Sequence, residues 1–415
     1  TYKNMNVIII HDNAMITGGA QKVAITEAVA LSEHGYKVIY FAAVGPIDPA
    51  LLNSKVKVEI LGQNELKDAL NGKYEKIKGA LRGLYNRDAY KKLNELLKKF
   101  DNKNTIVHIH GWSLALSPYI FKAIYENGFK VAITCHDYEI NCPVRTYFNY
   151  KLNKMCDKNG MSLSCIMCNC DKRSYIQKVY RVIRERIFYR YARKCDLSLI
   201  YLSEFNKNII EREKRLTTKG YIVPNLVEIP EYVNVNTKQN ELYLFIGRLN
   251  PEKGCELFCE AITRANVKGI VIGEGIEYEK LRNQYTNIEF SGWKTAKEMS
   301  TIIPKCRCLI MSSIWYEGAP LTIPEIQGGY SLPCIVPTPS GAVDYICDEK
   351  NGLIFKSGDI DSLVNCIVKL KDDKFVEKLT INCKKEFDRE KYTKNTHISR
   401  LVNVYEKILN SKYDL

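Results

Sequence analysis

The sequence predicts an α/β protein with two nucleotide-binding-like domains that face each other across a cleft. Short apolar runs typical of buried strands alternate with helical patterns, and this alternation occurs twice along the chain. A polar stretch without helical period, residues 228–240, separates the two series. The 415 residues also exceed one ordinary hydrophobic core and fit two domains of about 200 residues each.

The first half opens with a strand at 7–11, a glycine-containing turn and a helix at 20–34, which together form the start of a βαβ unit. Its further strands are expected at 37–42, 104–110, 130–134, 197–202 and 221–225, and its longer helices at 65–99 and 174–194. Residues 138–172 have no sustained period and hold five cysteines. We therefore interpret them as an insertion that a metal ion holds together.

The second half repeats the pattern and ends in an amphipathic, basic helix. Its strands are expected at 242–246, 269–272, 288–290, 308–312 and 332–337, with a helix from about 255 and the final helix at 392–411. We divide the chain into a first domain at 1–227, a second domain at 228–392 and a C-terminal helix at 393–415. That helix is expected to pack back toward the first domain.

Composition and charge narrow the class of protein. A hydrophobic content of 46% with 26% charged residues is typical of a globular protein. No stretch approaches the ~20 uncharged apolar residues that span a bilayer, and residues 1–6 lead into a strand instead of a signal peptide, so we expect a cytoplasmic protein. The net charge of +14 favours anionic partners.

Among anionic partners, we expect no nucleic acid, because no aromatic-basic RNA-binding motif is visible. The basic helical stretches at 77–99 and 174–194 are instead expected to hold anionic lipid or a polyprenyl-diphosphate. The protein would then lie peripherally at the inner face of the cell membrane.

The stretch 313–325 carries two carboxylates, Glu317 and Glu325, at the carboxyl end of a predicted strand, where ligands bind in open α/β sheets. Pro324 fits only the first turn of a helix, so Glu325 lies near a helix N-terminus that favours anions. Carboxylates accept hydrogen bonds from sugar hydroxyls while amides hold phosphate. The pair therefore suits a sugar attached to phosphates, although Glu317 could be merely solvated and Glu325 could only complement the helix dipole.

A turn at 247–254 follows the first predicted strand of the second half and contains two cations, Arg248 and Lys253. Gly247 and Gly254 allow the backbone to come close to a ligand. An arginine fork with a lysine point charge suits a diphosphate, whose negative charge grows as it leaves. A solvated turn is the alternative.

The order and spacing of these motifs resemble a retaining family 4 glycosyltransferase of the GT-B fold. The resemblance covers nearly the whole chain and depends on several short motifs taken together. They are Gly18-Gly19, His136, Gly247-Arg248-Leu249 with Lys253-Gly254, Gly273-x-Gly275, Glu317-x7-Glu325, Ser340-Gly-Ala-Val-Asp344 and Asn351-Gly352-Leu353.

The resemblance implies a role for each matching residue. Glu317 and His136 are the catalytic candidates beside the transferred sugar, and His136 would reach it from across the cleft. Glu325 would hold the nucleotide ribose hydroxyls. The other donor-binding candidates, which include the two cations for the diphosphate, are Gly18, Gly19, Gly247, Arg248, Lys253, Gly273, Gly318, Ala319, Pro320 and Leu321.

The resemblance also implies the reaction. Such an enzyme moves a hexose-type sugar from a nucleotide sugar, with a UDP-sugar as the expected donor, and retains the anomeric configuration without a catalytic metal. The acceptor would be a glycan or a polyprenyl-linked molecule in surface polysaccharide or lipopolysaccharide biosynthesis. The alternatives are a GT-B epimerase or hydrolase of sugar nucleotides, or a non-catalytic anion-binding protein.

The cysteine-rich insertion is predicted to bind structural zinc. Four thiolates can close a tetrahedral zinc site and order a loop that has little core of its own. The predicted ligands are Cys142, Cys156, Cys165 and Cys168, and Cys170 could replace Cys168. An iron–sulfur cluster and free thiols are the alternatives. A similar insertion after His-Asp occurs in some members of the family.

Two further histidines, His11 and His110, end or interrupt apolar runs. Either could be a buried histidine with satisfied hydrogen bonds, and His110 is the better candidate for ligand contact.

Overall fold

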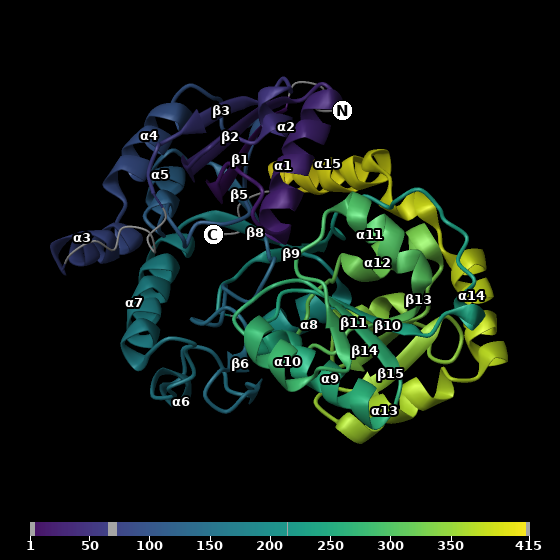
Figure 1. Ribbon diagram of the computed structural model, residues 1–415. Helices are drawn as coiled ribbons and strands as arrows, with labels where there is room; N and C mark the ends of the chain where they lie inside the picture. The colour runs from purple at the N-terminus through teal and green to yellow at the C-terminus, as the bar shows by residue number, and fades with distance from the viewer. Residues whose placement is uncertain (1–4, 65–72, 214, 412–415) are drawn as a thin grey trace.

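The computed structural model describes residues 5–64, 73–213 and 215–411, and it confirms an α/β fold with two parallel sheets (Figure 1). In the described residues, the first sheet has seven strands in the order β3-β2-β1-β4-β5-β8-β9. These strands are β1 (Asn6–Asn13), β2 (Lys37–Val44), β3 (Lys57–Ile60), β4 (Thr105–Ile109), β5 (Lys130–Thr134), β8 (Asp196–Tyr201) and β9 (Lys219–Ile222). Their central members are buried on both faces, which explains why they appear in the sequence as continuous apolar runs.

Helices cover both faces of this sheet. The helices of this half of the chain are α1 (Gly19–Glu33), α2 (Pro49–Leu52), α3 (Lys73–Leu84), α4 (Arg87–Leu97), α5 (Ile120–Glu126), α6 (Leu163–Ile166), α7 (Tyr175–Ala192) and α8 (Glu204–Glu211), and α6 lies away from the sheet. The helix expected at 65–99 is two helices, because the Asn86 side chain caps α4 by accepting from the Ala89 amide at 3.1 Å. Residues 65–72 of that expectation lie outside the described residues.

The second sheet has six parallel strands within the described chain, in the order β12-β11-β10-β13-β14-β15. These are β10 (Leu242–Ile246), β11 (Lys268–Ile272), β12 (Ile288–Phe290), β13 (Cys306–Ile310), β14 (Cys334–Thr338) and β15 (Gly352–Lys356). The helices of this half are α9 (Cys255–Arg264), α10 (Tyr278–Gln284), α11 (Ala296–Ile302), α12 (Thr322–Tyr330), α13 (Ile360–Lys369) and α14 (Asp373–Glu386).

The linker before β10 is fixed to the second domain by a buried arginine. The Arg307 guanidinium donates to the carbonyls of Thr237, Lys238 and Asn240 at 3.0–3.3 Å and pairs with Asp373 at 2.7 Å. A buried guanidinium needs such partners, because each unsatisfied donor costs free energy. Residues 237–240 therefore belong to the second domain.

The last helix, α15 (Lys394–Asn410), leaves the second domain and packs on the first sheet beside α1 (Figure 1). Tyr405 is fully buried there, and its hydroxyl lies 2.6 Å from Nδ1 of His108 on β4. Lys130 on β5 donates to the Ile408 and Leu409 carbonyls at 3.0 and 3.1 Å, which satisfies orphan groups at the helix C-terminus. The chain thus crosses between the domains twice.

The predicted insertion at 138–172 holds a short antiparallel hairpin of β6 (Phe148–Asn149) and β7 (Lys154–Met155), followed by α6.

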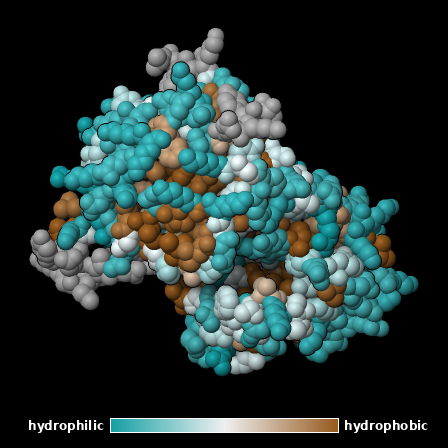
Figure 2. All heavy atoms as spheres, turned by 90° about the horizontal axis from the view of Figure 1, so that it is seen from above, coloured by the Kyte–Doolittle hydropathy of each residue, from teal (hydrophilic) through white to brown (hydrophobic). Residues whose placement is uncertain are grey.

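The surface seen from above is mainly hydrophilic, with a hydrophobic area left of centre (Figure 2). None of the helices in the described residues is both long and apolar enough to span a bilayer.

Candidate active site

A cleft of about 760 Å³ lies between the two domains. Its walls come from the carboxyl ends of β1, β4 and β5 on one side and of β10 and β13 on the other. Most of the sequence-predicted site residues line it, namely Gly18, Gly19, His136, Gly247, Arg248, Lys253, Glu317, Gly318, Ala319, Pro320 and Leu321. The two halves of the chain therefore contribute to one cavity.

Lys253 and Glu317 form an ion pair inside this cleft. Lys253 Nζ lies 2.6 Å from Glu317 Oε2, and the same oxygen accepts a hydrogen bond from the Trp315 indole at 2.9 Å. The ammonium also lies 5.0 Å from the centre of the Trp315 ring, within range of a cation–π contact. Lys253 is thus held in the cleft by a carboxylate that a phosphate group could replace.

Close backbone approach builds the loops that carry this pair. Gly254 has a φ of 66°, and a Cβ there would lie 2.0 Å from the Ser312 carbonyl oxygen. The Gly341 amide donates to the Glu317 carbonyl at 2.7 Å, and the Ser203 hydroxyl of the first domain donates to the Gly318 carbonyl at 2.7 Å. Glycine is required where two loops come this close. The backbone after Glu317 is therefore fixed from both domains.

Arg248 is exposed at the cleft, and no ion pair engages it among the described residues. Gly273 does not line the cleft. Its φ is 137°, and a Cβ would lie 1.9 Å from the Gly247 carbonyl oxygen, so it supports the loop that carries Gly247 and Arg248.

Glu325 lies in the first turn of α12, one turn behind the cleft wall, and is half-buried. Burial raises its pKa to about 7, although the positive charge of Lys22 acts against this. A carboxylate in that environment is stabilised by hydrogen-bond donors, which the hydroxyls of a ligand would supply. Its position at a helix N-terminus agrees with the sequence-based expectation.

In the first domain, Asp12 anchors the loop after β4. Its buried carboxylate accepts from the amides of Leu114, Ala115 and Leu116 at 2.8–3.0 Å. Burial nevertheless raises its pKa. Asp12 lines the cleft but has no signal in the sequence, because a carboxylate near a strand end has many ordinary roles.

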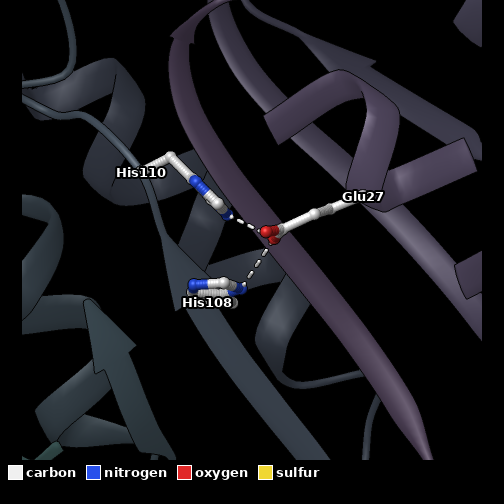
Figure 3. A group of neighbouring side chains, drawn as sticks. All are labelled: Glu27, His108 and His110. Carbon is white, nitrogen blue, oxygen red and sulfur yellow. Dashed lines mark ion pairs between the residues drawn. The ribbon is translucent and has the colours of Figure 1, made fainter. Parts of the chain in front are cut away.

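His136 lies in the cleft wall and contacts a second histidine. Its Nε2 is 2.9 Å from Nδ1 of His110, and Nε2 of His110 is 3.3 Å from the carboxylate of Glu27 on α1 (Figure 3). Burial, and then the nearby His110, lower the pKa of His136 well below its ordinary value. His110, the secondary candidate, is thus the direct partner of His136.

Arg145 was missed by sequence reasoning, although it lines the cleft beside His136. Its guanidinium binds the Asp137 carboxylate through Nε at 2.9 Å and a terminal nitrogen at 2.6 Å. The insertion that carries Arg145 was interpreted from its cysteines alone. Only the fold reveals that its first turn contributes to the cleft.

Two of the five cysteines in the insertion contact a buried lysine. Lys178 of α7 is 0% exposed, and its Nζ lies 2.9 Å from Cys170 Sγ and 3.6 Å from Cys165 Sγ. Cys142 and Cys165 interact electrostatically, and Cys156 interacts with Cys165, Cys168 and Cys170. Among the described residues, Glu27, His108 and His110 bring possible metal-ligand atoms within 4.8 Å of one another. No three sulfurs of the described cysteines lie that close together.

Comparisons with known proteins agree with this architecture. Residues 17–229, just over half of the chain, match the family model described as Glycosyltransferase Family 4, and residues 229–388 match the model of Glycosyl transferases group 1.

Relatives among curated proteins are distant. The chain is 28% identical over 240 residues to the UDP-Gal:alpha-D-GlcNAc-diphosphoundecaprenol alpha-1,3-galactosyltransferase of Escherichia coli. The aligned region covers 51% of this chain and 60% of that protein. It is 25% identical over 256 residues to an uncharacterized glycosyltransferase of Methanocaldococcus jannaschii, and this match covers 60% of this chain and 70% of that protein. The match therefore covers less than two thirds of the Escherichia coli relative.

Solved structures share the fold across the chain. Anabaena HepE in complex with UDP and glucose has a TM-score of 0.66 at 13% identity, with 97% of this chain and 100% of that chain covered. Staphylococcus aureus TarM in complex with UDP has a TM-score of 0.66 at 13% identity, with 98% and 100% covered. The sequence matches and this shared architecture together show that the chain belongs to glycosyltransferase family 4 and has the GT-B fold.

Proposed function

We propose that this protein is a retaining glycosyltransferase that moves a hexose-type sugar from a nucleotide sugar to a glycan or polyprenyl-linked acceptor. The observation that carries the proposal is a single cleft in which Lys253 and Glu317 of one domain and His136 of the other meet. The product would belong to surface polysaccharide or lipopolysaccharide biosynthesis.

The electrostatics of the cleft suit departure of a nucleoside diphosphate. Negative charge grows on the leaving oxygens during sugar transfer, so nearby cations stabilise the transition state more than the ground state. Arg248 is exposed at the cleft and Lys253 lies inside it. Since two cations can neutralise the leaving group, the proposal includes no catalytic metal.

The donor and acceptor classes draw support from relatives. The Escherichia coli relative is named for UDP-galactose and a diphosphoundecaprenol acceptor, and the similar Anabaena structure holds UDP and glucose. We propose a UDP-sugar as donor and a polyprenyl-diphosphate-linked acceptor for this chain. The basic composition, with a net charge of +14, agrees with two anionic substrates.

We also propose that the first domain binds the cytoplasmic face of a membrane through α7. Ile176, Val179 and Ile183 are exposed and follow helical spacing, and Arg186 and Arg190 continue the same face. An apolar stripe that runs into a basic one suits the surface of an anionic bilayer. The Tyr180 hydroxyl donates to the Ala80 carbonyl of α3 at 3.0 Å, which places exposed Ile77 and Leu81 on the neighbouring helix.

A structural zinc ion at the cysteine cluster remains our proposal. The supporting observation is that Cys165 and Cys170 contact the buried ammonium of Lys178 and that the other three thiols interact with this pair, in a segment with little regular structure. A site of four thiolates carries net negative charge, which a buried ammonium would offset. The sulfurs are spread more widely than in a closed tetrahedral site. The proposed ligands are those predicted from the sequence, with Cys170 as the candidate in place of Cys168.

Replacing Lys253 should separate a transferase from a binding protein. We expect K253M to lower kcat/KM for transfer from a UDP-sugar by about 100-fold or more, because the departing diphosphate loses a half-buried cation. Product analysis by mass spectrometry, with a panel of UDP-, GDP- and TDP-sugars and with or without a polyprenyl-linked acceptor, measures this.

The matched control is K297M, which removes an exposed lysine of α11 in the same domain and should leave transfer unchanged. Acceptor-independent release or rearrangement of the sugar by the wild type would indicate a hydrolase or epimerase. Binding without turnover across the panel would indicate a non-catalytic protein.

Glu325 should impose a pH-dependent cost on stability. Its folded pKa of about 7 exceeds the ordinary value of 4.5, so ionisation above that range disfavours the folded state, and stability falls as the pH rises from about 4.5 to 7. E325Q should therefore melt about 2–6 °C higher than the wild type at pH 8 and at the same temperature near pH 4. Thermal unfolding at both pH values tests this, and an equal difference at the two would contradict it.

The membrane proposal predicts loss of vesicle binding when the apolar stripe of α7 becomes polar. The I176S/I183S double variant should sediment at least about fivefold less with vesicles that contain anionic phospholipid, since each buried apolar side chain contributes to the binding. V368S, an exposed apolar position on α13 of the second domain, is the control. Equal sedimentation of wild type and double variant would refute the proposal.

The zinc proposal predicts about one zinc ion per purified chain by elemental analysis. C165S should lower the zinc content and the melting temperature, because it removes a buried thiol of the cluster. C347S, at an exposed cysteine of the second domain, should change neither. Iron in place of zinc would instead indicate an iron–sulfur cluster, and absence of both metals would indicate free thiols.

A further inference from the structure

A buried chain of acidic and imidazole groups lies directly behind His136, and Figure 3 shows its members His110 and Glu27 beside His108. It runs from His136 to His110, then to the Glu27 carboxylate of α1, and ends at His397 of α15. His110, Glu27 and His397 are 3–4% exposed. No step of the proposed reaction uses the last three groups, so their arrangement needs a separate explanation.

The hydrogen bonds of His397 determine its protonation. Nδ1 lies 3.0 Å from the Pro224 carbonyl oxygen, which can only accept, so Nδ1 carries a proton. Nε2 lies 2.8 Å from Glu27 Oε1. Since an ionised carboxylate also only accepts, Nε2 carries a proton as well. Glu27 and His397 are thus a buried carboxylate–imidazolium pair.

The ionised state of Glu27 agrees with its surroundings. Burial acts to raise its pKa, but the contacts with His110 and His397 outweigh that effect and hold the pKa well below the ordinary value. The other carboxylate oxygen, Oε2, faces Nε2 of His110 at 3.3 Å. Neither atom has another hydrogen-bond partner among the described residues, so the negative charge of this oxygen favours the His110 tautomer with its proton on Nε2.

This proton position fixes the tautomer of His136. Because the imidazolium of His397 already balances the single negative charge of Glu27, we take His110 as neutral. Neutral His110 with a proton on Nε2 has a lone pair on Nδ1, which lies 2.9 Å from Nε2 of His136. Nε2 of His136 must then donate, and Nδ1 of His136 is left as an acceptor. Among the described residues, no hydrogen bond occupies that Nδ1. His136 therefore presents an acceptor and not a donor to a ligand in the cleft.

We propose that Glu27 and His397 are positioning residues that, through His110, make Nδ1 of His136 a hydrogen-bond acceptor for a hydroxyl of the bound sugar or acceptor. The inference rests on the proposed function, because it assumes that a hydroxylated substrate reaches His136. It assigns the C-terminal helix a part in the chemistry. A neighbouring group that holds the tautomer of a catalytic imidazole is a known source of large rate effects.

The same groups are an unsuitable metal site, even though Glu27, His108 and His110 could be ligands by distance alone. Both ring nitrogens of His108 are already engaged, by Tyr405 at 2.6 Å and Thr134 at 2.7 Å. A cation would have to break these bonds and the Glu27–His397 contact.

Two substitutions of similar size at Glu27 separate the effect of the His136 tautomer from the effect of the Glu27 charge. In E27Q, the amide nitrogen can donate to neutral His397 while the amide oxygen still accepts from His110, so the tautomer of His136 is kept. E27L removes the acceptor and leaves Nε2 of both imidazoles without its partner, while their Nδ1 contacts with Pro224 and His136 remain. We expect E27Q to retain most of the transfer activity and E27L to lose at least about tenfold in kcat, with little change in KM for the donor.

Nitrogen NMR of histidine-labelled protein provides a readout that does not depend on activity. The chain has only six histidines, and H136Q and H397Q assign the two rings of interest. In the wild type, we expect His397 to be protonated on both nitrogens and His136 on Nε2 alone. In E27L, the Nε2-only state of His136 should no longer be exclusive.

Several results would overturn the inference. These are a His136 proton on Nδ1 in the wild type, equal activity of E27L and wild type, or a folded E27Q as impaired as E27L. Loss of one bound metal ion in E27L would also overturn it. If E27L does not fold, the wild-type spectrum still decides. If the protein transfers no sugar but the expected tautomers are seen, the proposed function fails while the hydrogen-bond arrangement stands.

Discussion

All strands of the two large sheets run parallel to their neighbours, and this constraint produces the site. Parallel strands bring their carboxyl ends to one edge of a sheet, where loops are free of the ladder. His110 follows β4, His136 follows β5, and Gly247 follows β10. Because the two edges face the same cleft, residues more than 100 positions apart line one cavity.

The two walls of the cleft differ in how their polar groups are held. In the first domain, amides bind Asp12 and a guanidinium binds Asp137 in the wall, and imidazoles bind Glu27 behind it. The second domain presents an exposed Arg248 and a Lys253 paired only with Glu317. The fixed polar groups of the first wall can orient a hydroxylated substrate, while the two cations of the second wall suit a diphosphate whose charge changes during the reaction.

Local patterns predicted much of the fold. The strands at 130–134 and 242–246 were predicted with their observed bounds, since both are short apolar runs bounded by polar residues. The 65–99 helix was wrong in part, because the cap at Asn86 depends on a fold that brings Ala115 within 2.8 Å of the Asn86 side chain.

The candidate site likewise contains some residues that local patterns predict and others that they do not. Lys253 and Glu317 stand in recognisable turns, whereas Glu27 is one residue of an ordinary helix, and its partner His397 lies 370 positions away. No local pattern can reveal such a pair. The spacing of His108 and His110 was a usable signal, since alternate residues of a strand share a face. The cysteine spacing likewise identified a cluster but could not reveal Lys178.

The path of the chain end follows from the cost of burying charge. Without α15, the Glu27 carboxylate would lack the imidazolium of His397, and an uncompensated buried charge costs several kcal/mol. The first domain is therefore completed by a helix that comes after the second. His397 also binds the Pro224 carbonyl, and Arg389 donates to the Pro230 carbonyl at 2.8 Å, so the two crossings between domains are joined to each other. The domains are thus connected at one place, where both crossings and His397 lie together.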